Sequence, residues 1–376
     1  MAEPLQRSRQ KDGNCVMSTI VDNKVASLTI KPLNLEWEQE YELFVDKHPA
    51  AMLCYSLKWL DVVAAVTGAE PLYSMCLADD KIVGVMPAFL QSSPQGNVLN
   101  ALPFYGFHGE PLVDPEYPQA HRLLLDAFWE EAKHRRCRSA TVISNPLMGE
   151  PEWALPYKSV CCHDKRIGQI VQLPEPNDDA ALLHLFEGRT RTAIRKAVKE
   201  GLVWRTESDK QRLDDVFRLH VLNAAALGIP PKPAEFFKAV AERMVIGIDY
   251  DIYTASISGQ PTKDIAHLLL FYYAHTVEYF TPCIVDEYRS RQPLSLLIFE
   301  AMKRAASAGY RYWNFGGTAA HQTGVYTFKK SWGAMDLPYH YQTRLYDASL
   351  RDSTTEELLK TYPYFYTIPF SELETR

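Results

Sequence analysis

The chain has 376 residues, 47% of them hydrophobic and 12% aromatic, so it can bury a large core and is long enough for two domains of ordinary size. Its net charge is -6 and its isoelectric point is about 6.0, which argues against a surface built as a whole to bind nucleic acid or an anionic membrane. A polyanionic partner would therefore have to bind a local basic patch.

The cysteines and the apolar stretches indicate the cellular compartment of the protein. Seven cysteines are scattered along the chain and never spaced as C-x-x-C, which argues against a disulfide framework and a zinc site. The N-terminus lacks the apolar segment of a signal peptide. The longest apolar stretch, residues 265–280, is interrupted by His267, His275 and Glu278. We therefore expect a cytoplasmic protein with no metal site and no transmembrane segment.

The first part of the chain predicts an α/β arrangement. Residues 81–90 and 97–107 are typical of strands, residues 117–136 of an amphipathic helix, and residues 139–144 of a further strand. We expect these elements to belong to an N-terminal domain spanning residues 17–165.

The second part shows the same order of elements. Residues 264–273 and 276–285 predict strands, residues 294–309 predict a helix that ends in a glycine, and residues 310–315 predict a strand. They fall in an expected C-terminal domain spanning residues 166–376.

The two helices suggest a duplication. Five apolar positions of the first helix fall on five of the second at an offset of 174 residues (294 − 120). The pairs start from Ala120, Leu123, Leu124, Ala127 and Phe128. Any buried amphipathic helix has this spacing, so a repeat and a coincidence both stay open on the pattern alone.

A basic segment lies between the two parts. Read as a helix that ends at Gly201, residues 189–199 place all their cations on one arc and contain no acid. The cations are Arg189, Arg191, Arg195, Lys196 and Lys199. They either form a solvated face or bind an anionic substrate, because they have no acidic partner one turn away. On the second interpretation we expect the basic face to line the cleft between the domains.

Four stretches together carry a family resemblance: residues 188–202, 216–237, 310–317 and 326–334. Their order resembles the FemAB-like branch of the GNAT acyltransferase superfamily, which includes the peptidoglycan-bridge aminoacyltransferases and relatives in exopolysaccharide and natural-product clusters. The resemblance covers about residues 56–345. It implies two GNAT-like domains in tandem, each with a mixed, mostly antiparallel sheet flanked by helices.

The resemblance also implies an activity. A GNAT-type enzyme holds an activated acyl donor and an amine in one cleft, and the amine attacks directly without a covalent enzyme intermediate. We therefore expect an N-acyl- or N-aminoacyltransferase acting on a small-molecule, sugar-nucleotide or envelope precursor amine. Two alternatives stay open: a non-catalytic module that binds tRNA or another polyanion, and a scaffold subunit.

The donor cannot be chosen from the sequence. The stretch that matches the phosphate-binding loop of acyl-CoA-dependent relatives, residues 286–297, has a proline at Pro293 and no glycine. Tyr288, Arg289, Arg291 and Ser295 are candidate substrate-binding residues, although an equal alternative is that the two arginines are surface residues beside a helix that starts with a proline. Acyl-CoA and aminoacyl-tRNA both remain candidate donors, and no tightly bound cofactor is expected.

The catalytic candidates lie near the end of the resemblance. It implies that Phe328 and Lys329 face the cleft of the second domain, with Lys329 next to the developing oxyanion. We read this segment as extended, so that Lys329 points inward and Lys330 outward. By the same resemblance, Asn314, Gly316 and Gly317 lie beside the substrate.

The acid–base candidates are fewer. Glu287 follows a strand immediately before the central helix and is the candidate acid or base, with pairing to an arginine as the alternative. Glu278 interrupts a strand and receives no role. In the first domain the equivalent stretch, residues 106–119, has acids and prolines but no arginine or lysine. We therefore expect the first domain to lack an active centre.

Overall fold

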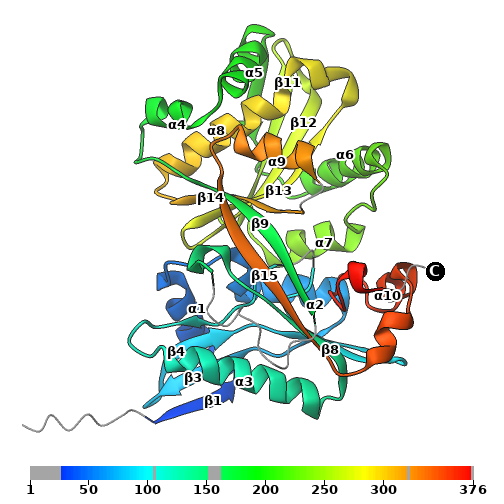
Figure 1. Cartoon of the computed structure of the whole chain (residues 1–376). Helices are drawn as coiled ribbons and strands as arrows, with labels where there is room; N and C mark the ends of the chain where they lie inside the picture. The colour runs from blue at the N-terminus through cyan, green and yellow to red at the C-terminus, as the bar shows by residue number, and fades with distance from the viewer. Residues whose placement is uncertain (1–26, 105–106, 151–161, 320–321, 374–376) are drawn as a thin grey trace, which may run out of the picture.

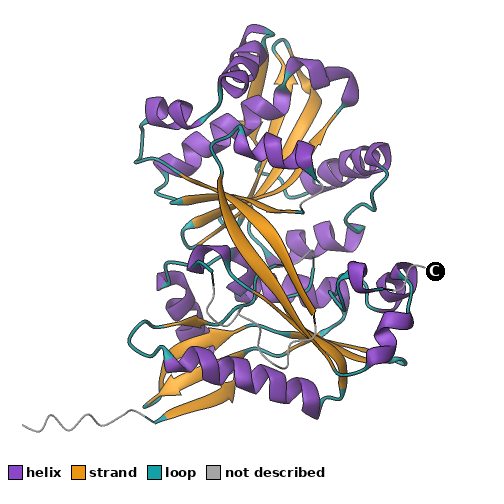
Figure 2. Ribbon diagram, in the orientation of Figure 1, coloured by secondary structure: helices purple, strands orange, loops and turns teal. Residues whose placement is uncertain are grey.

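The computed structural model describes residues 27–104, 107–150, 162–319 and 322–373. Two α/β bodies lie one above the other and two long strands, β9 (Cys162–Gln172) and β15 (Met335–Leu345), run between them (Figure 1). We call residues 27–150 the first half and residues 162–345 the second half. Helices cover the sheets of both (Figure 2).

The elements of the first half are short. Its strands are β1 (Leu28–Pro32), β2 (Glu70–Pro71), β3 (Ser74–Ala78), β4 (Lys81–Met86), β5 (Phe89–Ser93), β6 (Gly96–Ala101), β7 (Leu112–Val113) and β8 (Cys137–Ile143). Its helices are α1 (Glu38–Lys47), α2 (Leu57–Thr67) and α3 (Gln119–His134).

The second half has longer strands. They are β9, β10 (Leu202–Thr206), β11 (Tyr250–Ile257), β12 (Gln260–Tyr273), β13 (Thr276–Ile284), β14 (Tyr312–Thr318) and β15. The helices are α4 (Asp179–Leu185), α5 (Gly188–Lys199), α6 (Arg212–Leu227), α7 (Ala234–Arg243), α8 (Pro293–Ser307) and α9 (Thr323–Lys330). A C-terminal segment follows with α10 (Thr355–Thr361).

One sheet joins the halves. Eleven strands are hydrogen-bonded in the order β10-β11-β12-β13-β14-β9-β15-β8-β6-β5-β2, and a separate sheet has the order β1-β3-β4-β7. β9 pairs antiparallel with β14 and with β15, and β15 also pairs with β8. The two halves therefore share backbone hydrogen bonds through the two long strands.

Each half contains the same unit, so the duplicated α/β fold is confirmed. In the first half the hairpin β5-β6 leads through α3 to β8, which is parallel to β6; in the second half β12-β13 leads through α8 to β14, which is parallel to β13. A parallel neighbour requires such a crossover. The unit is the reason the two stretches of sequence share a pattern.

The offset of 174 residues is wrong by one. All six buried residues of α3 fall on buried residues of α8 at an offset of 173 (293 − 120). Leu123, which the sequence placed in the core, is 37% exposed. Apolar residues three and four apart satisfy both offsets, and only the packing on the sheet decides between them.

Aromatic side chains from both halves form a common core. The ring of Trp59 on α2 lies 5.6 Å from those of Phe271 and Phe280 and 6.1 Å from that of Phe236. Edge-to-face ring pairs contribute about 0.5–1.5 kcal/mol each beyond their buried area. This cluster therefore holds the first half against β12, β13 and α7 of the second.

The C-terminal segment returns to the first half (Figure 1). Leu350, Leu358 and Tyr362 are buried in the same core as Trp59. The main-chain N–H and C=O of Tyr366 bond to the side chain of Asn100 on β6, both at 2.8 Å. The end of the chain is thus a structural part of the first half.

Candidate active site

A cleft of about 690 Å³ lies within the second half, between α5, α8 and α9. It is lined by hydroxyl groups, two cations and two aromatic rings, with no aspartate or glutamate among its lining residues. The lining residues are Arg189, Thr190, Thr192, Ala193, Lys196, Gln292, Ser295, Thr323, Gly324, Thr327, Phe328, Ser331 and Trp332. Such a lining suits a ligand with negative charge and an apolar portion.

The basic helix contributes the cations. α5 buries Thr190, Ile194 and Ala197 and turns its basic arc outward. Arg189 and Lys196 line the cleft, and Lys196 has no ion pair among the described residues. The expectation that this face lines the cleft between the two halves is wrong, because α5 packs on α8 and β10 of its own half.

Two other arginines of this helix lie outside the cleft. The guanidinium of Arg191 donates to the main-chain oxygens of Phe186 and Leu183, which ties α5 to α4. Arg195 is exposed. Arg189 itself pairs with Glu187 at 2.9 Å and donates to the carbonyl of Thr327 on α9 at 2.8 Å, so it bridges two walls of the cleft.

The residues before α8 mostly pair with one another. Arg289 lies 2.8 Å from Asp286, and Arg291 lies 3.8 Å from Glu200 and 5.7 Å from the ring centre of Tyr288. The pairing of arginine with acid, which the sequence left open, is therefore present.

At the start of α8, Ser295 lies in the cleft. Its hydroxyl donates to Gln292 at 3.3 Å. Glu287 is exposed and does not line the cleft.

The segment that the sequence read as extended is the helix α9, so that expectation is wrong. Phe328 in α9 and Trp332 in the turn that follows it both line the cleft, whereas Lys329 is not among the lining residues. Lys329 and Lys330 still point in different directions, because consecutive residues of a helix are about 100° apart. Lys329 is 6% exposed, whereas Lys330 lies near the surface 3.5 Å from Asp336.

The ammonium group of Lys329 is held by β14. Its Nζ donates to the carbonyls of Gly316 and Gly317 at 3.0 and 2.9 Å and to the hydroxyl of Thr318 at 2.9 Å. These bonds use all three of its protons. Burial lowers the pKa of Lys329 to about 8.

The two glycines allow this arrangement. β14 departs from regular pairing with β9 between Asn314 and Gly317, and Gly316 has φ +76°. A Cβ on Gly317 would lie 1.9 Å from the hydroxyl of Tyr339 on β15. Larger residues at both positions would displace the carbonyls that Lys329 contacts.

A polar network continues on both sides of this bulge. Asn314 accepts from the main-chain N–H of Gly316 at 2.8 Å and donates to Glu278 on β13 at 2.7 Å. On the other side the Thr318 hydroxyl donates to Gln169 at 2.7 Å. Gln169 in turn donates to the main chain of α9 at 3.1 Å. The network thus connects β13, β14, β9 and α9.

Glu278 is the residue of this site that the sequence interpretation missed. It is 4% exposed, and burial raises its pKa to about 8. The signal was present, since Glu278 is the one acid within an otherwise apolar and aromatic strand. Without the partner strand, however, its environment could not be assigned.

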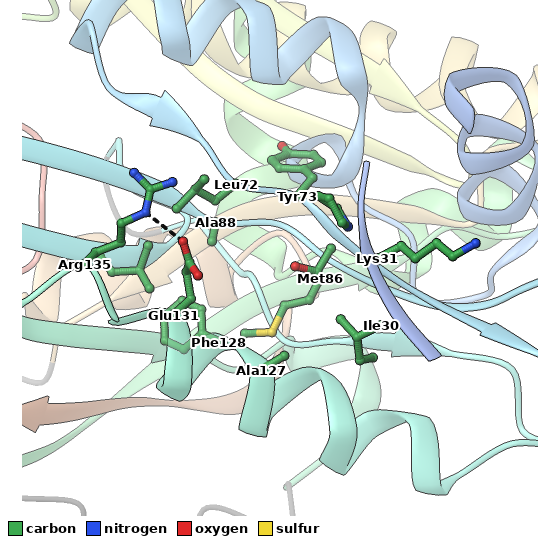
Figure 3. Close-up of a pocket in the computed structure, with 13 residues that line it drawn as sticks. Ile30, Lys31, Leu72, Tyr73, Met86, Ala88, Ala127, Phe128, Glu131 and Arg135 are labelled. Carbon is green, nitrogen blue, oxygen red and sulfur yellow. Dashed lines mark hydrogen bonds and ion pairs between the residues drawn. The ribbon is translucent and has the colours of Figure 1, made fainter. Parts of the chain in front are cut away.

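The first half has a different cavity, of about 390 Å³, between β1, β3 and α3 (Figure 3). Its walls are mainly apolar, and Glu131 pairs with Arg135 at its edge at 2.8 Å. Lys31 lies on the opposite side (Figure 3). The charges there largely compensate, in contrast to the acid-free lining of the second-half cleft.

Residues 186–330 match the family model for an acetyltransferase (GNAT) domain, and they contain every residue that lines the cleft except Ser331 and Trp332. The cleft therefore lies in the part of the chain that matches a GNAT domain. The expected family is therefore confirmed for the part of the chain that holds the cleft, the basic helix and Lys329. No curated protein sequence matches the chain.

Solved structures place the GNAT domain in a larger arrangement. The chain is similar to FemX with a TM-score of 0.64 and 16% identity, over 86% of this chain and 98% of that one. A C-terminal domain of a putative lysylphosphatidylglycerol synthetase from Agrobacterium fabrum gives 0.54 and 12%, over 89% and 99%. L-PGS from Bacillus licheniformis gives 0.53 and 10%, over 87% and 96%. At these identities the likeness shows a shared fold, and it agrees with the FemAB-like arrangement of two GNAT-like units.

Membrane-spanning helices and metal sites were also sought in the described part of the chain. No helix in the described part of the chain is both long and apolar enough to cross a bilayer. Within the same residues, no three side chains of histidine, cysteine, aspartate or glutamate come together as a metal site. The five described cysteines are buried.

Proposed function

We propose that this acyltransferase moves an acyl or aminoacyl group from a phosphate-bearing donor onto an amine. The amine belongs to a small molecule, a sugar nucleotide or an envelope or exopolysaccharide precursor. The observation that carries the proposal is the acid-free cleft between α5, α8 and α9 inside the matched GNAT domain. We further propose that residues 166–376 carry the chemistry and that residues 17–165 form a unit without an active centre of its own.

The donor class follows from the chemistry of the cleft. Arg189 and Lys196 supply positive charge, and hydroxyl groups of Ser295 and Thr323 supply hydrogen bonds. Acyl-CoA and aminoacyl-tRNA both present phosphates next to an activated acyl group, so both fit. The names of the similar structures favour the second, because lysylphosphatidylglycerol is an aminoacylated lipid. Both donors are made in the cytoplasm, where we place the reaction.

Lys329 acts in this proposal through its charge. Its three protons are held by main-chain and hydroxyl oxygens, so it fixes the bulge of β14 and keeps a buried positive charge beside it. A negative charge that develops on the carbonyl oxygen of the donor near Gly316 and Gly317 would be stabilised by this ammonium. Asn314, Gly316 and Gly317 then shape the place where the acyl group sits.

The test is a transfer assay with purified protein. The protein is incubated with a set of acyl-CoAs or with charged tRNA, in each case with a mixture of amines, and the amines are analysed by mass spectrometry. We expect one donor class to produce an amine whose mass increases by the acyl or aminoacyl group. Donor binding with no transfer from either class would instead identify a non-catalytic binding module.

A further inference from the structure

A cavity of about 330 Å³, which we call the β9 cavity, lies between β9 and the C-terminal segment. Asp164 and Arg166 on β9 and Ala319, just after β14, contribute to one wall, and residues from the stretch 365–371 form the other. No described residue lines both this cavity and the cleft between α5, α8 and α9. The two are therefore separate sites.

The β9 cavity adjoins the bulge of β14. Ala319 directly follows Thr318, whose hydroxyl accepts a hydrogen bond from Lys329 at 2.9 Å. The helix α9 carries both Lys329 and Phe328, and Phe328 lines the cleft. The two sites are thus connected through Lys329 and through residues that neighbour it or its bonding partner in the sequence.

Tyr339 forms a second connection between the β9 cavity and the bulge. It stands opposite Arg166 in the ladder of β9 and β15, and its hydroxyl lies 1.9 Å from the place that a Cβ on Gly317 would take. Gly317 is an exposed residue of the bulge, and its carbonyl accepts from Lys329 at 2.9 Å. A molecule in the β9 cavity would therefore lie beside the groups that we propose to surround the acyl group.

Arg166 makes no hydrogen bond in the described part of the chain. Its side chain is 33% exposed, its guanidinium lies 4.5 Å from the ring centre of Tyr341, and its Nε lies 3.4 Å from Asp164. A charge-assisted hydrogen bond normally places the two atoms about 2.7–2.9 Å apart. Arg138 of the first half, by contrast, donates to Asp347 at 2.7 Å. The donors of Arg166 are therefore available to a ligand.

The side chains of the β9 cavity suit an anionic sugar. The planar fork of an arginine matches a carboxylate or a phosphate, to which it can donate two parallel hydrogen bonds. Tyr366 and Phe370, the latter 49% exposed, offer aromatic rings against which a sugar ring can pack. Asp164 accepts from the Tyr366 hydroxyl at 3.4 Å, and its oxygens can accept from the hydroxyls of a sugar as well.

We propose that the β9 cavity binds the acceptor, and that this acceptor is a sugar that carries a phosphate or a carboxylate. The inference rests on the proposed function and narrows it, because it excludes acceptors that are neutral or purely cationic amines. The anionic group accepts from Arg166, and the sugar ring packs on Tyr366 and Phe370. The donor occupies the cleft between α5, α8 and α9, so the two substrates approach Lys329 from separate sites.

The first arm of the test measures binding and needs no transfer. Purified protein is titrated calorimetrically with UDP-glucose, glucuronate, glucose and inorganic phosphate. We expect UDP-glucose or glucuronate to bind roughly tenfold more tightly than glucose or phosphate, and the one that binds identifies the anionic group. Arg166→Gln should weaken the binding of that probe by roughly 10–100-fold, because it removes charge-assisted hydrogen bonds.

Three further variants locate the probe. Arg243→Gln is the matched control, because Arg243 on α7 is 34% exposed but pairs with Glu242 at 3.1 Å, and its affinity should equal that of wild type. Phe370→Ala keeps Arg166 and removes an exposed ring, so it should also weaken binding, and it replaces Arg166→Gln should that variant not fold. A loss of affinity in Lys196→Ala but not in Arg166→Gln would place the probe in the other cleft and overturn the assignment.

The second arm uses the transfer assay with acetyl-CoA and lysyl-tRNA as separate donors. The acceptors are glucosamine, glucosamine 6-phosphate, UDP-glucosamine and 2-amino-2-deoxyglucuronate, which share one amine and differ in the anionic group. We expect at least one anionic derivative to be preferred over glucosamine. Arg166→Gln should raise the KM for that derivative by roughly tenfold and leave the KM for the donor unchanged.

The outcomes separate the two claims. Transfer to glucosamine as efficient as to every derivative, or an acceptor KM that is unchanged in Arg166→Gln, overturns the acceptor site and leaves the proposed function standing. Binding that depends on Arg166, with no transfer from either donor, overturns the proposed function and with it the acceptor role. No binding of any probe to wild type overturns the β9 cavity as a site for an anionic sugar, whatever the transfer assay gives.

Discussion

Each half contains an equivalent pair of parallel strands, but the polar side chains on the two pairs differ in their hydrogen-bond partners. In the first half, Asn100 on β6 stands opposite Thr141 on β8, on the face away from α3. In the second half, Glu278 on β13 stands opposite Asn314 on β14, on the face away from α8. The two positions correspond in the fold, but only the second pair includes an ionisable side chain.

In the first half both of these side chains have hydrogen-bond partners within the protein. Asn100 exchanges two hydrogen bonds with the main chain of Tyr366, and the hydroxyl of Thr141 bonds to that of Thr343 at 2.8 Å. The C-terminal segment thus covers the strand pair. The paired strands there continue for one further residue pair, to Ala101 and Val142.

In the second half the same position is less completely satisfied. One oxygen of Glu278 has no described partner, and the strands part at this point. The two copies of one scaffold therefore differ, because the C-terminal segment completes the first and one carboxyl oxygen of the second has no described partner. Four experiments test this difference between the halves.

The largest effect is expected at Lys329. Lys329→Met removes a buried charge and leaves three oxygens of β14 without their donor. We expect the transfer rate to fall by about 10²–10³-fold, roughly 2.7–4 kcal/mol of transition-state stabilisation, together with a lower melting temperature. Lys330→Met should stay within a few-fold of wild type in single-turnover transfer, since Lys330 lies near the surface. Equal and small effects of both substitutions would contradict a role for Lys329.

The next experiment compares one substitution in each of the two strand pairs. Asn100→Ala leaves main-chain groups of Tyr366 without partners and should lower the free energy of unfolding by roughly 2–4 kcal/mol, with little change in transfer at a temperature where the variant is folded. Asn314→Ala should reduce the transfer rate at least tenfold, because it releases Glu278 and Gly316. Urea unfolding and transfer are measured on both. A loss of rate in folded Asn100→Ala would place chemistry in the first half as well.

A smaller effect is expected in donor binding. Lys196→Ala should raise the KM for the phosphate-bearing donor by about tenfold, which corresponds to about 1.4 kcal/mol, with the melting temperature nearly unchanged. Lys238→Ala on α7, an exposed lysine outside the cleft, is the control of equal charge. The difference between the two variants should shrink as salt is added. An equal KM in both would remove Lys196 from the donor site.

The smallest effect is expected at Gly324, in the first turn of α9. A Cβ there meets no atom within 4 Å. Gly324→Ala should raise the free energy of unfolding by about 0.4–1 kcal/mol, because alanine restricts the unfolded chain. The melting temperature measures this change. A loss of stability would contradict the open space that the structure shows beside Gly324.

The sequence alone determined the elements that have a strong local pattern. The strand–strand–helix–strand units and the basic helix α5 followed from periodicity, capping glycines and apolar content. The family resemblance added the tandem GNAT arrangement and directed attention to Lys329, Asn314, Gly316 and Gly317. These four do come together on β14 and α9.

Only the tertiary structure decided the rest. Residues 326–330 are helical, whereas their sequence was read as extended, and the rings of Phe328 in α9 and Trp332 just after it lie 6.4 Å apart. Glu278 acquires its raised pKa from burial between β14 and the first half, far away in sequence. Which oxygen of a buried acid remains without a partner depends on every neighbouring strand, and this information is not local to any stretch of the chain.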